Sequence, residues 1–216
     1  MHVHTSDERV LSLGFGGYTC NWGVHMCCLY ESDRERDEVL YGFLHQGDVD
    51  EDLAVYGHPE SSPERFETEY ANRFPREADH PRDPQRFTLL STERLYHPGG
   101  AFRPLDLDAV WVGLRDRAAA GNRHARGIAE MDWALRDVPG RELLIPYEAR
   151  IDGLFVNAPM AGTCLYDLRR FPGATITGVL QTHRFTVSRG VLLENPTYDP
   201  TGWLAEHAPD FPPLAA

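Results

Sequence analysis

The stretch Gly23-Val24-His25-Met26-Cys27-Cys28-Leu29-Tyr30-Glu31-Ser32 decides the fold of this chain. Residues 24–30 contain no Asp, Glu, Lys or Arg, and acidic residues follow them at once. This pattern is typical of a buried strand that leads into a helix. Side chains alternate along a strand. We therefore expect His25, Cys27 and Leu29 on one face, and Met26, Cys28 and Tyr30 on the other.

Outward from this strand, the pattern alternates between helices and strands. Ser32-Asp33-Arg34-Glu35 is a capping-box motif and predicts the start of a helix. Mostly apolar runs predict further strands at 53–56, 87–91 and 160–166, and alternation predicts another at 128–133. Helical spacing predicts helices near 64–74, 104–121, 144–154 and 175–182. Two short apolar runs around Arg189-Gly190 predict a C-terminal β-hairpin. The fold class is therefore α/β, with three layers and a mostly parallel central sheet flanked by helices.

We expect one domain over residues 22–200, preceded by a flexible lead-in at 1–21 and followed by a loosely held tail at 201–216. Residues 57–86 carry the weakest pattern. The N-terminus lacks the basic and apolar regions of a signal peptide. No apolar segment approaches the ~20 residues that span a bilayer. We therefore expect a cytoplasmic protein, in which the four cysteines are reduced.

The net charge of the chain limits the kinds of molecule that it can bind. The chain has 33 acidic and 21 basic residues, a net charge of -12. Such a surface repels phosphate backbones, so we expect no nucleic-acid and no membrane partner. The turn after Tyr30 has five acids and neither glycine nor lysine between Glu31 and Glu38. A phosphate loop needs glycine amides and a lysine, so we expect no ATP binding there.

Polar and aromatic side chains stand at three strand ends, which are Tyr30-Glu31, Asp132-Trp133 and Tyr166-Asp167. Ligands of parallel sheets bind beyond the carboxyl ends of the strands, so a crevice lined by these residues is the predicted site. Glu130 and Asp132 alternate along their predicted strand and would share one face, ~7 Å apart. They are candidates for acid/base catalysis, although an ion pair with Arg150 or Arg170 is the favoured interpretation.

Imidazoles and thiols form a second group of candidates. His25, Cys27, Cys28, Cys164 and His183 could bind zinc, copper, iron or haem, but no spacing among them is diagnostic. We interpret them as packed core or strand-end residues and predict no cofactor. For His183, capping of a helix terminus or a hydrogen bond to a carbonyl is the favoured role.

Several segments together resemble one known family. They are His25-Met26-Cys27-Cys28-Leu29-Tyr30-Glu31, Glu130-Met131-Asp132-Trp133-Ala134-Leu135, Tyr147-Glu148-Ala149-Arg150, Cys164-Leu165-Tyr166-Asp167, Arg170-Phe171-Pro172, Leu180-Gln181-Thr182-His183 and Glu194-Asn195-Pro196. In this order they resemble the MEDS domain, the sensory module of the dichloromethane-responsive repressor and of methanogen histidine kinases. The resemblance implies a RecA/KaiC-like domain with a degenerate phosphate loop that senses small organic molecules. Matching motif positions are His25, Cys27, Tyr30, Cys164, Tyr166, Asp167 and His183.

The leading hypothesis is a stand-alone sensor, because the domain fills the chain and no output segment is recognisable. A small organic ligand would lie against Tyr30, Trp133 and Tyr166, oriented by Glu130, Asp132 and His183, and a separate regulatory protein would read the change. Two alternatives stay open. One is an enzyme that tailors a secondary metabolite with Glu130, Asp132 or His183 as acid/base. The other is a metal or haem protein that uses His25, Cys28, Cys164 and His183. Homo-oligomerisation is also left open.

Overall fold

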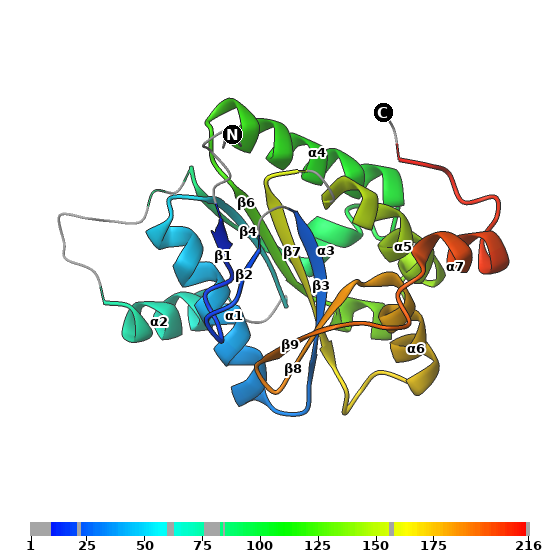
Figure 1. Cartoon of the computed structure of the whole chain (residues 1–216), viewed down its shortest axis with the longest axis horizontal. Coiled ribbons are helices and arrows are strands. Elements are labelled where there is room, and N and C mark those ends of the chain that lie inside the picture. The colour runs from blue at the N-terminus through cyan, green and yellow to red at the C-terminus, as the bar shows by residue number, and fades with distance from the viewer. Residues whose placement is uncertain are drawn as a thin grey trace, which may run out of the picture.

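A computed structural model describes residues 10–20, 23–59, 63–75, 83, 85–155 and 158–214 (Figure 1). Its centre is a seven-stranded sheet in the order β5-β4-β6-β7-β3-β8-β9. The strands are β3 (Val24–Tyr30), β4 (Leu53–His58), β5 (Phe87–Ser91), β6 (Ala125–Glu130), β7 (Met160–Asp167), β8 (Phe185–Ser188) and β9 (Val191–Glu194). All neighbouring pairs are parallel except β8 and β9, which form the predicted antiparallel hairpin.

Helices cover both faces of this sheet and confirm the three-layer α/β prediction. One face packs against α1 (Asp33–Val49) and α2 (Pro63–Arg73). The other face packs against α3 (Thr92–Tyr96), α4 (Pro104–Ala120), α5 (Leu144–Phe155) and α6 (Gly173–Thr182). In Figure 1 these two sets lie on opposite sides of the strands. We refer to them as the α1 face and the α5 face.

The first predicted strand and helix form as the sequence indicates. β3 is buried along its whole length between β7 and β8. His25 and Cys27 lie on the α5 face, and Cys28 and Tyr30 lie on the α1 face. The Ser32 hydroxyl accepts a hydrogen bond from the backbone N–H of Glu35, which is the predicted helix cap.

Strand β6 differs from its prediction at both ends. It begins at Ala125 and ends at Glu130, and Asp132–Leu135 forms the 3-10 helix η1. Glu130 and Asp132 therefore do not share a strand face, and the predicted pair of carboxylates is wrong. The early start places Arg126 in the core, where its guanidinium bonds to Asp52 at 2.5 Å. A buried arginine interrupts the apolar pattern, so the sequence did not reveal this part of the strand.

The two ends of the chain carry short elements. Where we predicted a flexible lead-in, Leu11–Ser12 (β1) and Thr19–Cys20 (β2) form a small hairpin, and Leu11 and Leu13 are buried. Residues 1–9, 21 and 22 of that segment lie outside the described residues. Where we predicted a loose tail, Pro200–His207 forms α7 beside α5 and α6. Across the described ranges, every helix is too short or too polar to cross a membrane.

Candidate functional site

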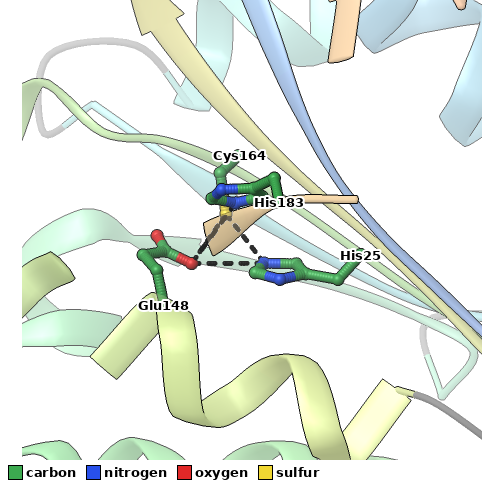
Figure 2. A group of neighbouring side chains, drawn as sticks. All are labelled: His25, Glu148, Cys164 and His183. Atoms are coloured by element: carbon green, nitrogen blue, oxygen red, sulfur yellow. Dashed lines mark hydrogen bonds and ion pairs between the residues drawn. The ribbon is translucent and has the colours of Figure 1, made fainter. Parts of the chain in front are cut away.

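Four side chains of types that can bind a metal ion lie together between the sheet and the helices that cover its α5 face (Figure 2). His25 comes from β3, Cys164 from β7, Glu148 from α5, and His183 from the C-terminal end of α6. Every one of them is buried, with at most 8% of its surface exposed. We call these residues the buried cluster. Its position is within the core between sheet and helices, and not at the strand ends where the site was predicted.

Strand register explains why an imidazole fits at this depth. His25 pairs with Gly162 of β7, which has no side chain. A Cβ atom at Gly162 would lie 2.7 Å from the ring of Phe155 and 3.3 Å from that of His25. The space beside Gly162 is thus occupied by these two rings, which stack with centroids 5.1 Å apart. The same register places Cys164 opposite Cys27, on the same face as His25.

The ligand-type atoms of the buried cluster are close neighbours. His25 Nε2 lies 3.2 Å from Glu148 Oε2 and 3.5 Å from Cys164 Sγ. Glu148 Oε2 also lies 3.5 Å from His183 Nε2 and 3.7 Å from Cys164 Sγ. One carboxylate oxygen of α5 therefore contacts all three other members.

A second layer of polar groups contacts the atoms of these side chains that point away from the centre of the buried cluster. The Tyr166 hydroxyl donates to Glu148 Oε1 at 3.0 Å. Nδ1 of His183 lies 2.9 Å from the carbonyl oxygen of Val179. This contact matches the carbonyl bond expected for His183 from the sequence. Nδ1 of His25 faces Asp152 at 3.7 Å, and Asp152 in turn accepts a 2.5 Å hydrogen bond from the hydroxyl of Tyr198.

The electrostatics of the buried cluster favour one charged imidazole and one neutral one. Burial opposes the charge on His25, but Asp152, Cys164 and Glu148 together raise its pKa well above the ordinary value. Burial and the neighbouring His25 lower the pKa of His183 to about 4. Glu148 is fully buried, yet contact with His25 and His183 holds its pKa below the usual value. Burial raises the pKa of the Cys164 thiol to about 12.

A cavity of about 20 Å³ adjoins the buried cluster. His25, Glu148 and Cys164 line it, together with Tyr96 and Trp111. This volume has room for about one water molecule. The cavity is therefore too small for a porphyrin or for an organic ligand, and the haem alternative does not fit at this place.

A separate polar group lies on the α1 face, at the end of β6. The Tyr30 hydroxyl donates to Glu130 at 3.3 Å, and the guanidinium of Arg36 lies 3.7 Å from the same carboxylate. Burial raises the pKa of Glu130 to about 7, against the opposing effect of Arg36. Glu130 and His183 lie on opposite sides of the sheet, so the structure does not join the predicted acid/base candidates in one site.

The remaining predicted residues have other partners. Asp132 is half-buried and lies 3.6 Å from Arg170, one of the two arginines that we expected beside it. Trp133 packs between Tyr96 and Phe102, with ring centroids 4.9 Å from each. The other contacts are those of Asp167 with Arg169, Cys27 with Thr186, and Arg150 with Asp108. Tyr30 is on the opposite face from Trp133 and Tyr166, so these three aromatic residues do not line one crevice.

Sequence reasoning missed the two carboxylates that α5 contributes, Glu148 and Asp152. Both are buried, and they lie one turn apart on a helix whose other buried residues are mostly apolar. Two acidic residues at this spacing in a mostly apolar helix were a signal for a buried polar site, because a buried carboxylate is costly without a partner. In the sequence, Glu148 stands out only as part of one segment that carries the family resemblance.

A surface crevice lies beyond the carboxyl ends of β6 and β7, and its lining includes none of the residues predicted for the site. Its volume is about 410 Å³. Its walls come from η1, from the 3-10 turn η2 (Arg141–Leu143), from the start of α5, from the segment after β7 and from α6. They include Leu135, Ile145, Phe171, Arg141, Glu142 and Thr175. The Phe171 ring packs edge-on against Tyr166 at 5.1 Å, and Tyr166 bonds to Glu148. The crevice and the buried cluster are thus connected through two aromatic side chains.

Comparisons with known proteins agree with this architecture. A KaiC-like protein from the hyperthermophilic archaeon Pyrococcus horikoshii OT3 has a similar fold, with a TM-score of 0.56 and 9% sequence identity over 84% of this chain and 81% of that chain. No curated protein matches the sequence. The profile of MEDS, the methanogen/methylotroph, DcmR sensory domain, matches residues 24–184. The fold is therefore RecA/KaiC-like, and the chain belongs to the MEDS family of sensory domains.

Proposed function

We propose that this protein senses a small organic molecule, which binds in the crevice at the carboxyl ends of β6 and β7. The observation that carries the proposal is the crevice itself, with its volume of about 410 Å³ and its mixed lining. Ligand sites are typically ~300–1,000 Å³ and combine apolar walls with a few polar groups. Membership of a sensory family supports the same role.

The ligand class follows from the lining of the crevice. Leu135, Ile145 and Phe171 offer apolar contact, and Arg141, Glu142 and Thr175 offer hydrogen bonds at the rim. A neutral, mostly apolar molecule with one polar group suits these walls. Simple hydrocarbon derivatives such as short halogenated alkanes, alcohols and ketones have this character.

Signal transfer would begin at the wall formed by Phe171. A ligand that pushes on this ring also shifts Tyr166, which holds Glu148 of α5. Helix α5 contacts α4, α6 and α7, so a small displacement changes the outer surface of the α5 face. We propose that a separate regulatory protein recognises that surface. A ligand can shift such an equilibrium only by its difference in affinity for the two states.

A blocking variant tests the location of the ligand. Thr175→Trp places a large ring in the crevice, because Thr175 is half-buried and lines it. The control is Thr177→Trp, an exposed position on the same helix outside the crevice lining. A panel of short halogenated alkanes, alcohols and ketones is screened by thermal shift, and hits are titrated by calorimetry.

We expect saturable binding by the wild type and by Thr177→Trp, and at least tenfold weaker binding by Thr175→Trp. Unchanged affinity in a folded Thr175→Trp variant would show that the ligand binds elsewhere. A panel without any hit would count against sensing of this ligand class.

A further inference from the structure

We propose that the buried cluster is a zinc site, with Nε2 of His25, Nε2 of His183, Sγ of Cys164 and Oε2 of Glu148 as its four ligands (Figure 2). The site lies in the core, and its test does not depend on the ligand proposed for the surface crevice. The inference follows from the spacing of the four atoms, from the groups that orient them, and from their combined charge.

Spacing is the first argument. Tetrahedral zinc has bonds of ~2.0–2.3 Å to nitrogen, oxygen and sulfur, so its ligand atoms lie roughly 3.3–3.8 Å from one another. In the buried cluster, Glu148 Oε2 lies 3.2, 3.5 and 3.7 Å from the atoms of His25, His183 and Cys164. The distance from Cys164 Sγ to His25 Nε2 is 3.5 Å, and all four atoms lie within 4.8 Å of one another. Small shifts are enough to enclose a metal ion.

Orientation of the imidazoles is the second argument. A zinc-bound histidine typically donates its other ring N–H to a carbonyl or a carboxylate. His183 fits this pattern, because its Nδ1 bonds to the carbonyl oxygen of Val179 and its Nε2 points into the cluster. That Nε2 atom is buried and has no hydrogen-bond partner among the residues that the structure describes. For His25 the outer partner is more distant, because its Nδ1 lies 3.7 Å from the carboxylate of Asp152, which is ion-pair range and not a hydrogen bond.

The carboxylate ligand is oriented in the same way. Oε1 of Glu148 accepts a hydrogen bond from Tyr166 and leaves Oε2 for the centre of the cluster. Asp152 is held by the hydroxyl of Tyr198. Ligands and outer partners thus form two consecutive layers, which is the usual construction of a structural metal site.

Charge and donor type select zinc. Imidazole, thiolate and carboxylate in a tetrahedral arrangement suit Zn²⁺. When Zn²⁺ binds, the proton on Nε2 of His25 and the thiol proton of Cys164 leave to the solvent. Zn²⁺, the Cys164 thiolate and the Glu148 carboxylate then sum to zero charge. The ion and its four ligands are then neutral together, which avoids the large cost of burying an unpaired ion. The carboxylate of Asp152 beside His25 lies outside this sum.

The test uses Co²⁺ as a spectroscopic substitute for Zn²⁺. The full chain is stripped with a chelator, dialysed and titrated with Co²⁺, and bound Co²⁺ is then displaced with Zn²⁺. We expect one equivalent of cobalt, the strong visible bands of a tetrahedral ion, and a near-ultraviolet thiolate-to-cobalt band. Zinc should remove all of these bands.

Two cysteine variants locate the thiolate. Cys164→Ser should abolish the thiolate-to-cobalt band and weaken zinc binding at least 100-fold. Cys28→Ser is the matched control, because Cys28 is also buried, in the neighbouring strand, but lies on the α1 face. It should keep both the band and the affinity. A wild-type protein that binds no cobalt, or a band that survives Cys164→Ser, overturns the proposal.

A third variant decides the question if Cys164→Ser does not fold. Tyr166→Phe keeps the ring and removes only the hydrogen bond that the Tyr166 hydroxyl donates to Oε1 of the ligand Glu148. Loss of such an outer partner typically weakens metal binding ~10–100-fold. We expect about tenfold weaker zinc binding, and unchanged affinity would overturn the proposal.

Discussion

Nε2 of His25 lies 3.2 Å from Oε2 of Glu148, and both side chains are almost completely buried. One residue belongs to the central strand β3 and the other to α5, so this contact fixes a helix onto the sheet through an ion pair. Such pairs contribute little net stability when intact, but breaking one leaves an uncompensated buried charge. The contact therefore has consequences that can be measured without any metal.

In the chelator-treated protein, Glu148→Gln should lower the free energy of unfolding by about 3 kcal/mol, since His25 loses its nearest carboxylate. His25→Gln should also be destabilising, because Glu148 is then left buried without its cation. The double variant should lose less unfolding free energy than the two single variants lose in sum. Urea unfolding of the wild type and the three variants completes the cycle, with an expected coupling of ~1–3 kcal/mol. Additive effects would mean that the two residues do not interact.

A second prediction concerns the close approach of α4 to β6. A Cβ atom at Gly127 would lie 2.6 Å from Cζ3 of Trp111, a distance that real Cβ atoms do not adopt. Gly127→Ala therefore forces the indole to move, and overpacking of this kind costs roughly 1–3 kcal/mol. Gly113 on α4 is the control, because a Cβ atom there meets nothing within 4 Å.

Gly113→Ala should stabilise the protein by about 0.5–1 kcal/mol, since alanine has a higher helix propensity than glycine at an exposed position inside a helix. The two substitutions add the same methyl group and should shift the urea midpoint in opposite directions. Equal shifts would mean that Trp111 does not pack against Gly127.

The sequence predicted the sheet and its first helix because their signals are local. The uncharged run 24–30 and the Ser32 cap are contained within a few residues of each other. The position of the predicted strand at 128–133 was wrong for a related reason. Alternation of Glu130 and Asp132 does not reveal that the backbone turns into η1 directly after Glu130.

The buried cluster could be predicted only in part. His25, Cys164 and His183 were recognised by residue type, and Cys28 was wrongly grouped with them although it lies on the opposite face. Glu148, which contacts all three, was not a candidate. Its role depends on how α5 lies across β3 and β7, and this tertiary arrangement leaves no local signal.

The cap of α1 supplies a third prediction. The Ser32 hydroxyl accepts the N–H of Glu35, one of the donors that the first turn of a helix leaves unpaired. Ser32→Ala should cost about 1 kcal/mol in urea unfolding. Ser32→Thr keeps the oxygen and should stay within about 0.5 kcal/mol of the wild type. If both variants unfold at the same urea concentration, the hydroxyl does not cap the helix.

The fourth prediction is a pH dependence that Glu130 imposes on stability. This carboxyl is buried beside Arg36 and Tyr30, with Asp132 and Asp37 as nearby negative charges, and its pKa is raised from 4.5 to about 7. Between pH 4.5 and pH 7 the folded protein holds a proton there that the unfolded chain has released. The free energy of unfolding therefore falls as the pH rises through this window, because the folded state binds more protons.

The size of that fall is roughly 3 kcal/mol for a pKa difference of this magnitude. Glu130→Gln stays neutral at every pH, so its stability should not show this contribution. Urea unfolding of both proteins at several pH values from 4 to 8 gives two curves to compare. We expect the stability of the wild type relative to Glu130→Gln to decline from pH 4.5 to pH 7 and then to level off. Parallel curves would show that Glu130 is ionised throughout and that Arg36 compensates its burial.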